Sequence, residues 1–205
     1  MPYVLTVDQI ESRTSADLVE GALDELAAIP TVLPFTRTVG DELQGLLDEP
    51  LSVVDAILRL MRNGHWHIGL GIGGVQTPLP SSDPRAARGD AFLAARTAVE
   101  RAKTEVSHFA AASVREPDPE TADVETMVRL LGAVRSKRTE QGWEVADLLS
   151  QVRTHAEAAA RLRVSRQAVG QRAQTAQISL EQAAVPTLVR LLERAETASL
   201  RGGSA

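Results

Sequence analysis

The chain contains no cysteine, which rules out disulfide bonds and metal sites built on thiolates. It contains no run of about 18 apolar residues either, so we expect no transmembrane helix. The first ten residues, MPYVLTVDQI, have no basic region before their apolar stretch, so we expect no signal peptide. Together these absences predict a cytoplasmic protein that does not enter the membrane.

The composition is that of a globular protein. Of the 205 residues, 43% are hydrophobic and 24% are charged. A chain of this length can form one large domain or two small ones.

Charge is unevenly distributed along the chain. Residues 1–128 carry 10 Lys and Arg against 20 Asp and Glu, whereas residues 129–175 carry 9 against 4. Residues 176–205 carry three of each. A basic block beside an acidic one indicates two domains, one of which meets a polyanion. Ordinary scatter of surface charge is the alternative interpretation.

The first half of the chain alternates short apolar stretches with helical patterns. We expect strands at 3–8, 35–39, 43–47 and 65–75, helices at 15–29, 51–62 and 90–112, and a loop at 77–87. The order strand, helix, strand, strand, helix, strand is typical of a ferredoxin-like sheet. We therefore predict an α+β fold in which residues 1–112 form a ferredoxin-like antiparallel sheet domain.

A second domain of helices is predicted after a linker. Residues 113–121 contain two prolines and several charges, which favours a linker there. Apolar residues then recur at helical spacing over 122–137, 143–152, 154–162, 165–177 and 185–199. We predict an all-α domain over residues 122–205.

The segment Thr154 to Ala173 indicates a helix, a tight turn and a second helix, in a motif that we place at residues 154–175. We expect small and apolar residues to face inward where the helices cross: Ala158, Ala159, Leu162, Val164, Ala168 and Val169. The pattern resembles the helix-turn-helix of bacterial DNA-binding proteins. An ordinary alanine-rich helical hairpin is the alternative.

The second helix of this motif carries the candidate contacts to double-stranded DNA. Ser165 is placed to cap it, because its oxygen can accept a free backbone N–H. The positions expected to face a major groove are Arg166, Gln167, Gln171 and Arg172. One such unit contacts a half-site, which predicts a homodimer, and the apolar C-terminal helix offers a dimer seam or closes the domain core.

A further basic cluster, Arg135 to Arg138, lies near a predicted helix end. It marks a solvated helix end or a contact to DNA phosphate.

Two carboxylates in the first domain are candidate metal ligands. Asp8 ends the first predicted strand, and Asp41 lies in the turn of the central hairpin. If the two meet at one sheet edge, they suit a hard cation such as Mg²⁺. Residue types alone favour structural roles in a cap and a turn. His65 and His67 share a strand face, where a solvated polar face is favoured over a metal site.

Four short segments occur in the order of the class III nucleotide cyclase catalytic domain: VDQIESR, GDELQGLL, HIGLGIGGV and RGDAFLAAR. This resemblance implies that Asp8 and Asp41 bind metal, that backbone at residues 9–12 cradles phosphates, and that Mg²⁺ accompanies a nucleotide. Leu93 falls where the family has its transition-state asparagine. The resemblance therefore implies a degenerate domain rather than an active cyclase.

The whole chain is most similar to the SatD-like family of small bacterial proteins. The resemblance rests on a first strand that ends at Asp8, the segment GDELQG at residues 40–45 and the alternating glycine strand at residues 69–74. It is compatible with a C-terminal helix-turn-helix.

Two functional hypotheses follow, with a protein-binding adaptor as a third. The first is a DNA-binding transcriptional regulator whose cyclase-like domain is a sensor for a nucleotide effector or a scaffold. The alternative is a Mg²⁺-dependent nucleotide-binding protein or enzyme that uses Asp8 and Asp41.

Overall fold

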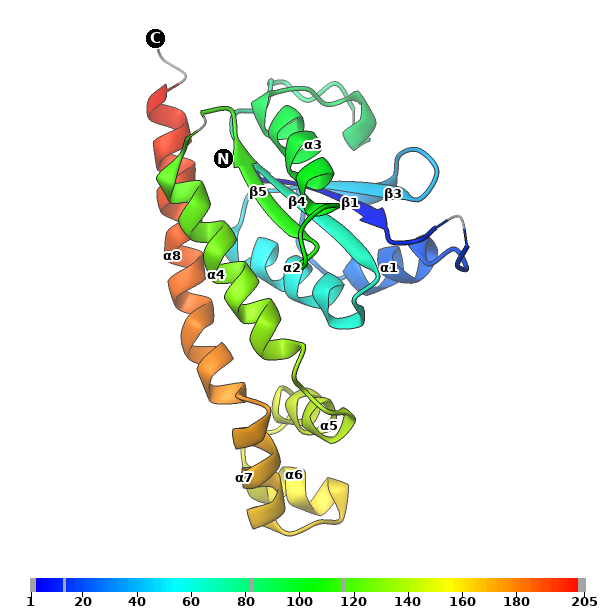
Figure 1. Cartoon of the computed structure of the whole chain (residues 1–205), viewed down its shortest axis with the longest axis vertical. Helices are drawn as coiled ribbons and strands as arrows, with labels where there is room; N and C mark the ends of the chain where they lie inside the picture. The colour runs from blue at the N-terminus through cyan, green and yellow to red at the C-terminus, as the bar shows by residue number, and fades with distance from the viewer. Residues whose placement is uncertain (1–2, 13, 82, 116, 203–205) are drawn as a thin grey trace. The chain divides into compact units, whose positions relative to one another are not determined.

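The computed structural model describes residues 3–12, 14–81, 83–115 and 117–202 (Figure 1). The chain divides into two compact units. We call residues 1–129 with 188–205 the sheet unit, and residues 130–187 the helical unit. The expectation that residues 1–112 and 122–205 act as separate domains stays a prediction.

The fold is α+β, and its sheet is mixed. In the described residues five strands lie in the order β2-β3-β1-β4-β5. Their bounds are β1 Tyr3–Gln9, β2 Leu33–Arg37, β3 Glu42–Leu47, β4 Trp66–Ile72 and β5 Phe109–Ser113. β1 pairs antiparallel with both β3 and β4, and β2 pairs antiparallel with β3. β5 runs parallel to β4.

The predicted order of strands and helices over the first 72 residues is confirmed. α1 (Val19–Leu26) follows β1, and α2 (Pro50–Asn63) connects β3 to β4. α2 begins with Pro50 and ends at Gly64, whose φ of 65° is the left-handed conformation that ends many helices. The predicted loop at 77–87 contains a short 3₁₀ turn, Pro84–Ala86.

The prediction of one long helix over residues 90–112 is wrong. α3 covers only Asp90–Ala102, and β5 follows it after a turn. The sequence FAAAS in β5 is fully buried. Alanine favours helix locally, but here tertiary packing decides, because small side chains on β5 lie against α3. The expected antiparallel sheet is therefore extended by a parallel fifth strand.

Close packing of α3 on the sheet explains the alternating glycines of β4. A Cβ at Gly69 would overlap the backbone of α3 at Val99, and a Cβ at Gly71 would overlap it at Ala91. α1 and α2 lie on the other face of the sheet (Figure 1). Glycine at these positions lets helix and strand backbones approach directly.

Side chains from two helices form hydrogen bonds with the backbone groups at the outer edge of β5. The Ala111 N–H donates to Glu125 at 2.7 Å, and the Ala111 carbonyl accepts from Arg101 at 3.1 Å. Arg129 donates to the Phe109 carbonyl at 3.2 Å. Glu125 and Arg129 come from α4 (Pro119–Arg135). Edge strands covered in this way are protected from pairing with another chain.

The helical unit contains α5 (Glu140–Leu149), α6 (His155–Leu162) and α7 (Arg166–Thr175) around one small core. Ala158, Ala159 and Val169 are buried, as predicted, and Leu162 and Val164 pack against them. Ala168 is only half-buried and lies outside this cluster. The described part of the last helix, α8 (Ile178–Gly202), begins in this unit.

Arg135 and Arg138 do not form a surface patch. They pair with Glu181 at 2.6 and 2.5 Å, and their guanidinium groups lie 4.7 and 4.8 Å from the Trp143 ring centroid. The side chain of Arg138 is only 2% exposed. Both arginines are therefore engaged within the helical unit, because their charges face the partly buried Glu181 carboxylate and the Trp143 ring.

No helix in the described ranges is both long and apolar enough to cross a membrane.

Candidate functional sites

The turn between α6 and α7 sets the position of the predicted DNA-contacting helix. α6 ends at Arg163, whose φ of 55° is left-handed, and Ser165 then caps α7. The Ser165 hydroxyl accepts a hydrogen bond from the Ala168 N–H at 3.1 Å, which confirms the predicted cap. Thr154 caps α6 in the same way, through the Glu157 N–H at 3.1 Å.

One face of α7 is polar and open to solvent. Ser165 is exposed just before it, and exposed residues continue at helical spacing through Arg166, Gln167, Gln171 and Gln174. Val169 and Ala173 lie on the opposite face, in the core. α7 contains no acidic residue, so nothing on this helix repels a polyanion.

Arg166 and Arg172 differ in their surroundings. Within the described ranges, Arg166 has neither an ion-pair partner nor a side-chain hydrogen bond, and its side chain is exposed. Arg172 is half-buried and pairs with Glu144 of α5 at 3.1 Å. Arg166 is thus the arginine of α7 that is open to a partner, and Arg172 would have to leave Glu144 first.

More basic side chains lie along the chain near α7. Arg153, Arg161 and Arg163 are exposed, as is Lys137. A pocket of about 300 Å³ lies between the start of α5 and α7, and Lys137, Thr139, Gln171 and Arg172 are among the residues that line it. Exposed arginine and lysine suit phosphate oxygens, and glutamine suits adenine edges.

The second predicted site lies where β1 ends. The cross-strand neighbour of Asp8 is Glu42, whereas Asp41 lies in the hairpin turn beyond the last paired residue. Asp8 pairs with Lys103 at 3.2 Å, and Glu42 pairs with Arg96. The structure therefore brings Glu42 opposite Asp8, and side chains at α3 already neutralise both carboxylates.

The electrostatics of Lys103 fit this arrangement. Burial opposes its charged form, but hydrogen bonds to Glu100 and Asp8 outweigh that effect and raise the pKa of Lys103. Across the described residues, no three His, Asp or Glu side chains converge closely enough to hold a metal ion. In this arrangement a cation at Asp8 has to displace Lys103.

The loop after β1 is closed by its own hydrogen bonds. The buried Gln9 side chain donates to the Ala16 carbonyl at 2.6 Å and accepts from the Leu18 N–H at 2.9 Å. The Ile10 N–H donates to the His65 carbonyl at 2.9 Å. Of residues 9–12, which we expected to cradle phosphates, Ile10 thus already uses its backbone N–H within the fold.

Sequence analysis missed a pair of histidines. His67, on β4, is the cross-strand neighbour of Asp8, and its ring packs edge-on against His108 rather than beside His65. The two Nδ1 atoms lie 3.3 Å apart. Burial and the neighbouring His108 lower the pKa of His67 below 6.5. Only the parallel pairing of β4 with β5 brings these residues together, so no sequence spacing reveals them.

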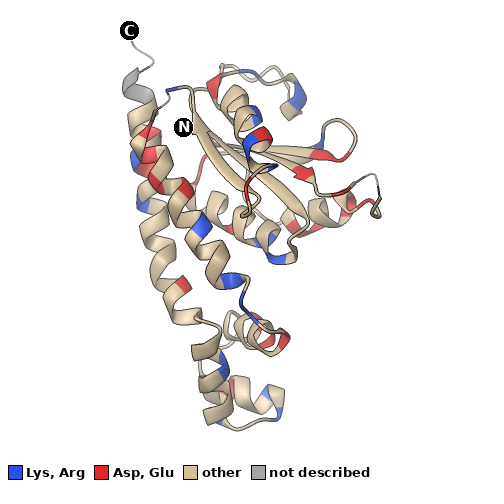
Figure 2. Cartoon of the chain, in the orientation of Figure 1, with Lys and Arg blue, Asp and Glu red and all other residues tan. Residues whose placement is uncertain are grey.

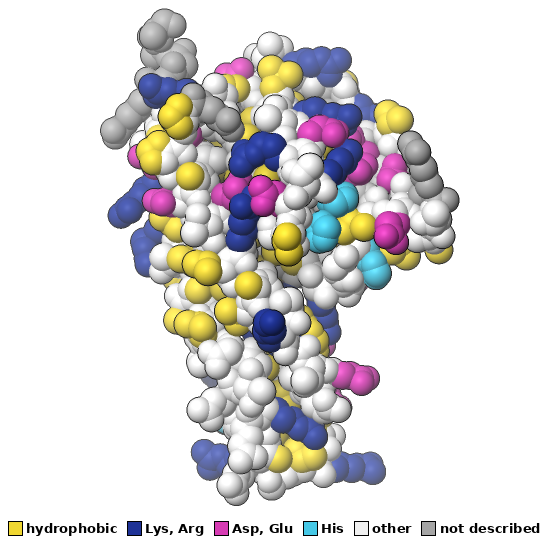
Figure 3. All heavy atoms as spheres, in the orientation of Figure 1, with side chains coloured by type: hydrophobic (Ala, Val, Ile, Leu, Met, Phe, Trp, Pro, Cys, Tyr) yellow, Lys and Arg dark blue, Asp and Glu magenta, His cyan; other side chains and the backbone are white. Residues whose placement is uncertain are grey.

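Figure 3 shows histidine side chains grouped among acidic and basic ones on the visible face of the sheet unit. Figure 2 marks the charged positions along the ribbon.

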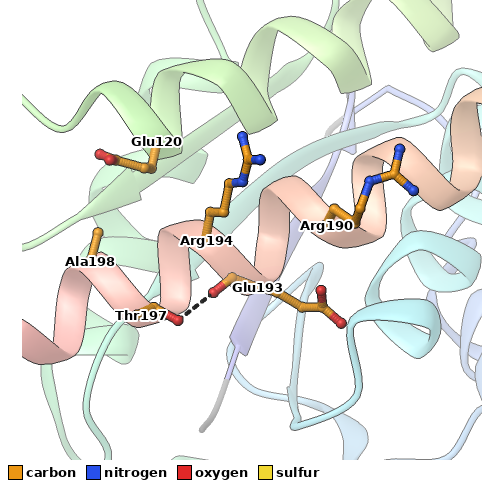
Figure 4. Close-up of a pocket in the computed structure, with 6 residues that line it drawn as sticks. All are labelled: Glu120, Arg190, Glu193, Arg194, Thr197 and Ala198. Atoms are coloured by element: carbon orange, nitrogen blue, oxygen red, sulfur yellow. Dashed lines mark hydrogen bonds between the residues drawn. The ribbon is translucent and has the colours of Figure 1, made fainter.

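A shallow pocket of about 420 Å³ lies along α8 in the sheet unit. Figure 4 shows Arg190 and Arg194 projecting from one side of α8. Glu193 projects from α8 in a different direction from these arginines, and Glu120 lies on α4. Thr197 donates to the Glu193 carbonyl at 2.8 Å. Charges of both signs line this pocket, so it favours no ligand of one charge.

No protein-family model, no curated protein and no solved structure matches this chain.

Proposed function

We propose that this protein binds double-stranded DNA through α6 and α7, and that it acts as a transcriptional regulator. The observation that carries this proposal is the solvent-exposed polar face of α7. Arg166, Gln167 and Gln171 lie on that face, without an acidic residue anywhere on the helix. Ordinary solvated helices mix charges of both signs, whereas a helix that enters a major groove presents basic and amide side chains.

Charge distribution supports the same proposal. The helical unit carries 8 Lys and Arg against 5 Asp and Glu, whereas the sheet unit carries 14 against 22. Arg135 and Arg138 pair with Glu181, so the exposed basic residues of the helical unit are those near α6 and α7. A polyanion would therefore meet this region first.

We infer a supporting role for the sheet unit. The strand order β2-β3-β1-β4, with α1 and α2 as connections, supports a ferredoxin-like, nucleotide cyclase-like assignment and fits the SatD-like resemblance. Lys103 pairs with Asp8 and Arg96 pairs with Glu42, so the carboxylates that a nucleotide-bound Mg²⁺ would need already have partners. We therefore propose a degenerate domain that acts as a sensor or scaffold.

The test is selection of genomic duplex DNA, followed by affinity measurements on the selected fragments. Arg166→Ala is the test variant, and Arg194→Ala is its matched control, because both arginines are exposed on helices. We expect Arg166→Ala to weaken binding by about tenfold or more and Arg194→Ala to leave it unchanged. Equal affinity of the two variants, or no binding by the wild type at low salt, would refute the proposal.

A further inference from the structure

His67 and His108 form a side-chain contact in the sheet unit that the sequence pattern did not predict. The rings meet edge-on with centroids 5.0 Å apart and Nδ1 atoms 3.3 Å apart. Two nitrogen ligands at the usual Zn–N distance on a tetrahedral ion are separated by about 3.3 Å. The pair thus has the spacing of two ligands of one transition-metal ion.

The backbone holds both rings in place. His67 lies within β4, and His108 follows α3 with a left-handed φ of 52°. The His108 N–H donates to the Glu105 carbonyl at 2.9 Å, and its carbonyl accepts from the Ile68 N–H at 2.8 Å. Histidine is one of the non-glycine residues enriched in this conformation, and these backbone hydrogen bonds fix the position of the ring.

The surroundings contribute a negative charge. Asp8, the cross-strand neighbour of His67, brings a negative charge to the same face of the sheet. Lys103 pairs with Asp8 at 3.2 Å and offsets part of that charge.

We propose that His67 and His108 bind one divalent transition-metal ion of the zinc type, with water completing its coordination. Imidazole nitrogen suits Zn²⁺, Co²⁺ and Ni²⁺, whereas Mg²⁺ prefers oxygen ligands. This site lies in the sheet unit and does not depend on DNA binding. The competing arrangement is a hydrogen bond between two neutral rings, with no affinity for metal.

The test is a calorimetric titration of the untagged, chelator-treated full chain with ZnCl₂, with MgCl₂ as the comparison. We expect one Zn²⁺ per chain, a rise in the thermal midpoint and no response to Mg²⁺. Co²⁺ gives a second readout, because its visible absorption bands report nitrogen coordination.

Variants separate the site from other histidines. His108→Asn removes one ligand while tolerating the left-handed backbone, and His65→Asn is the matched control on an exposed histidine. We expect His108→Asn to weaken zinc binding by about tenfold or more, and His65→Asn to leave it unchanged. Lys103→Ala should tighten it, because the variant removes a positive charge beside the site.

Circular dichroism of each metal-free variant shows whether it folds, and His67→Asn repeats the test if His108→Asn does not. No saturable zinc binding by the folded wild type, or binding equal in wild type and a folded variant that lacks either ring, would overturn the proposal.

Discussion

The two units of this protein use their charged side chains differently. In the sheet unit, the carboxylates at the end of β1 and the start of β3 are paired with basic side chains at α3, Asp8 with Lys103 and Glu42 with Arg96. In the helical unit, two arginines are buried on Glu181, yet Arg166 on α7 stays exposed and unpaired within the described ranges. Charges already paired within the fold stabilise it, whereas an unpaired surface charge remains available to a partner.

The largest expected effect tests whether the sheet unit depends on direct backbone packing. Gly71→Val places a side chain where the backbone of α3 already lies, so we expect a loss of more than about 4 kcal/mol in the free energy of unfolding. Gly74→Ala is the control, because a Cβ added there would have no other atom within 4 Å. Urea denaturation measures both. A Gly71→Val variant as stable as the control would contradict the packing described here.

The second prediction concerns the buried ion cluster of the helical unit. Glu181→Gln removes the carboxylate charge that pairs with both Arg135 and Arg138, at an expected cost of about 3 kcal/mol. The surface pair of Asp55 and Arg59 gives the comparison, since Asp55→Ala should cost less than about 1 kcal/mol. Equal costs in denaturant titrations would show that the Glu181 cluster is not buried in solution.

A smaller effect is expected at the start of α4. Asp118 accepts hydrogen bonds from the Glu120 N–H, Ser113 and Thr121, so Asp118→Ala should cost about 1 kcal/mol. Although burial acts in the opposite direction, the Ser113 and Thr121 hydrogen bonds lower the pKa of Asp118 below 3.8.

This depressed pKa makes the contribution of Asp118 pH-dependent. The stabilisation is present above pH 3.8 and is lost as the pH falls through the lower folded-state pKa. Wild type and Asp118→Ala should therefore converge in thermal stability at acidic pH. A difference that stays constant from neutral pH down to about pH 2 would argue against this role for the carboxylate.

The smallest effect is expected at Arg163, and its sign is opposite to that of the effect at Arg161. Arg163 has a left-handed backbone, so Arg163→Gly should raise stability by about 0.5 kcal/mol. Arg161 lies within α6, where Arg161→Gly should lower it by about 1 kcal/mol. Both variants lose one positive charge, so each is a charge control for the other. Changes of the same sign would mean that α6 does not end at Arg163 in solution.

Local patterns predicted most elements, because their signals lie close together in the chain. The apolar spacing at α2, the cap at Ser165 and the core positions Ala158 and Val169 each depend on neighbours within a few residues. β5 could not be predicted in this way, since alanines favour helix until α3 packs on them.

Side-chain partners between distant segments were the other failure. The sequence pointed to Asp41 as the partner of Asp8, whereas strand register places Glu42 opposite it. Two further contacts depend on tertiary structure alone. They are the contact between His67 and His108, which are 41 residues apart, and the ion pairs of Arg135 and Arg138 with Glu181. DNA contact by Ser165, Arg166, Gln167, Gln171 and Arg172 stays a prediction.

The most direct test of the central claim is the salt dependence of duplex DNA binding for wild type, Arg166→Ala and Arg194→Ala. We expect the logarithm of the association constant to fall with log salt between about 50 and 200 mM, with a slope about one unit shallower for Arg166→Ala and unchanged for Arg194→Ala. Arg172→Ala should fall between these variants, because Glu144 already pairs with that side chain. Identical slopes and affinities for wild type and Arg166→Ala would contradict the account of α7 as the DNA-contacting helix.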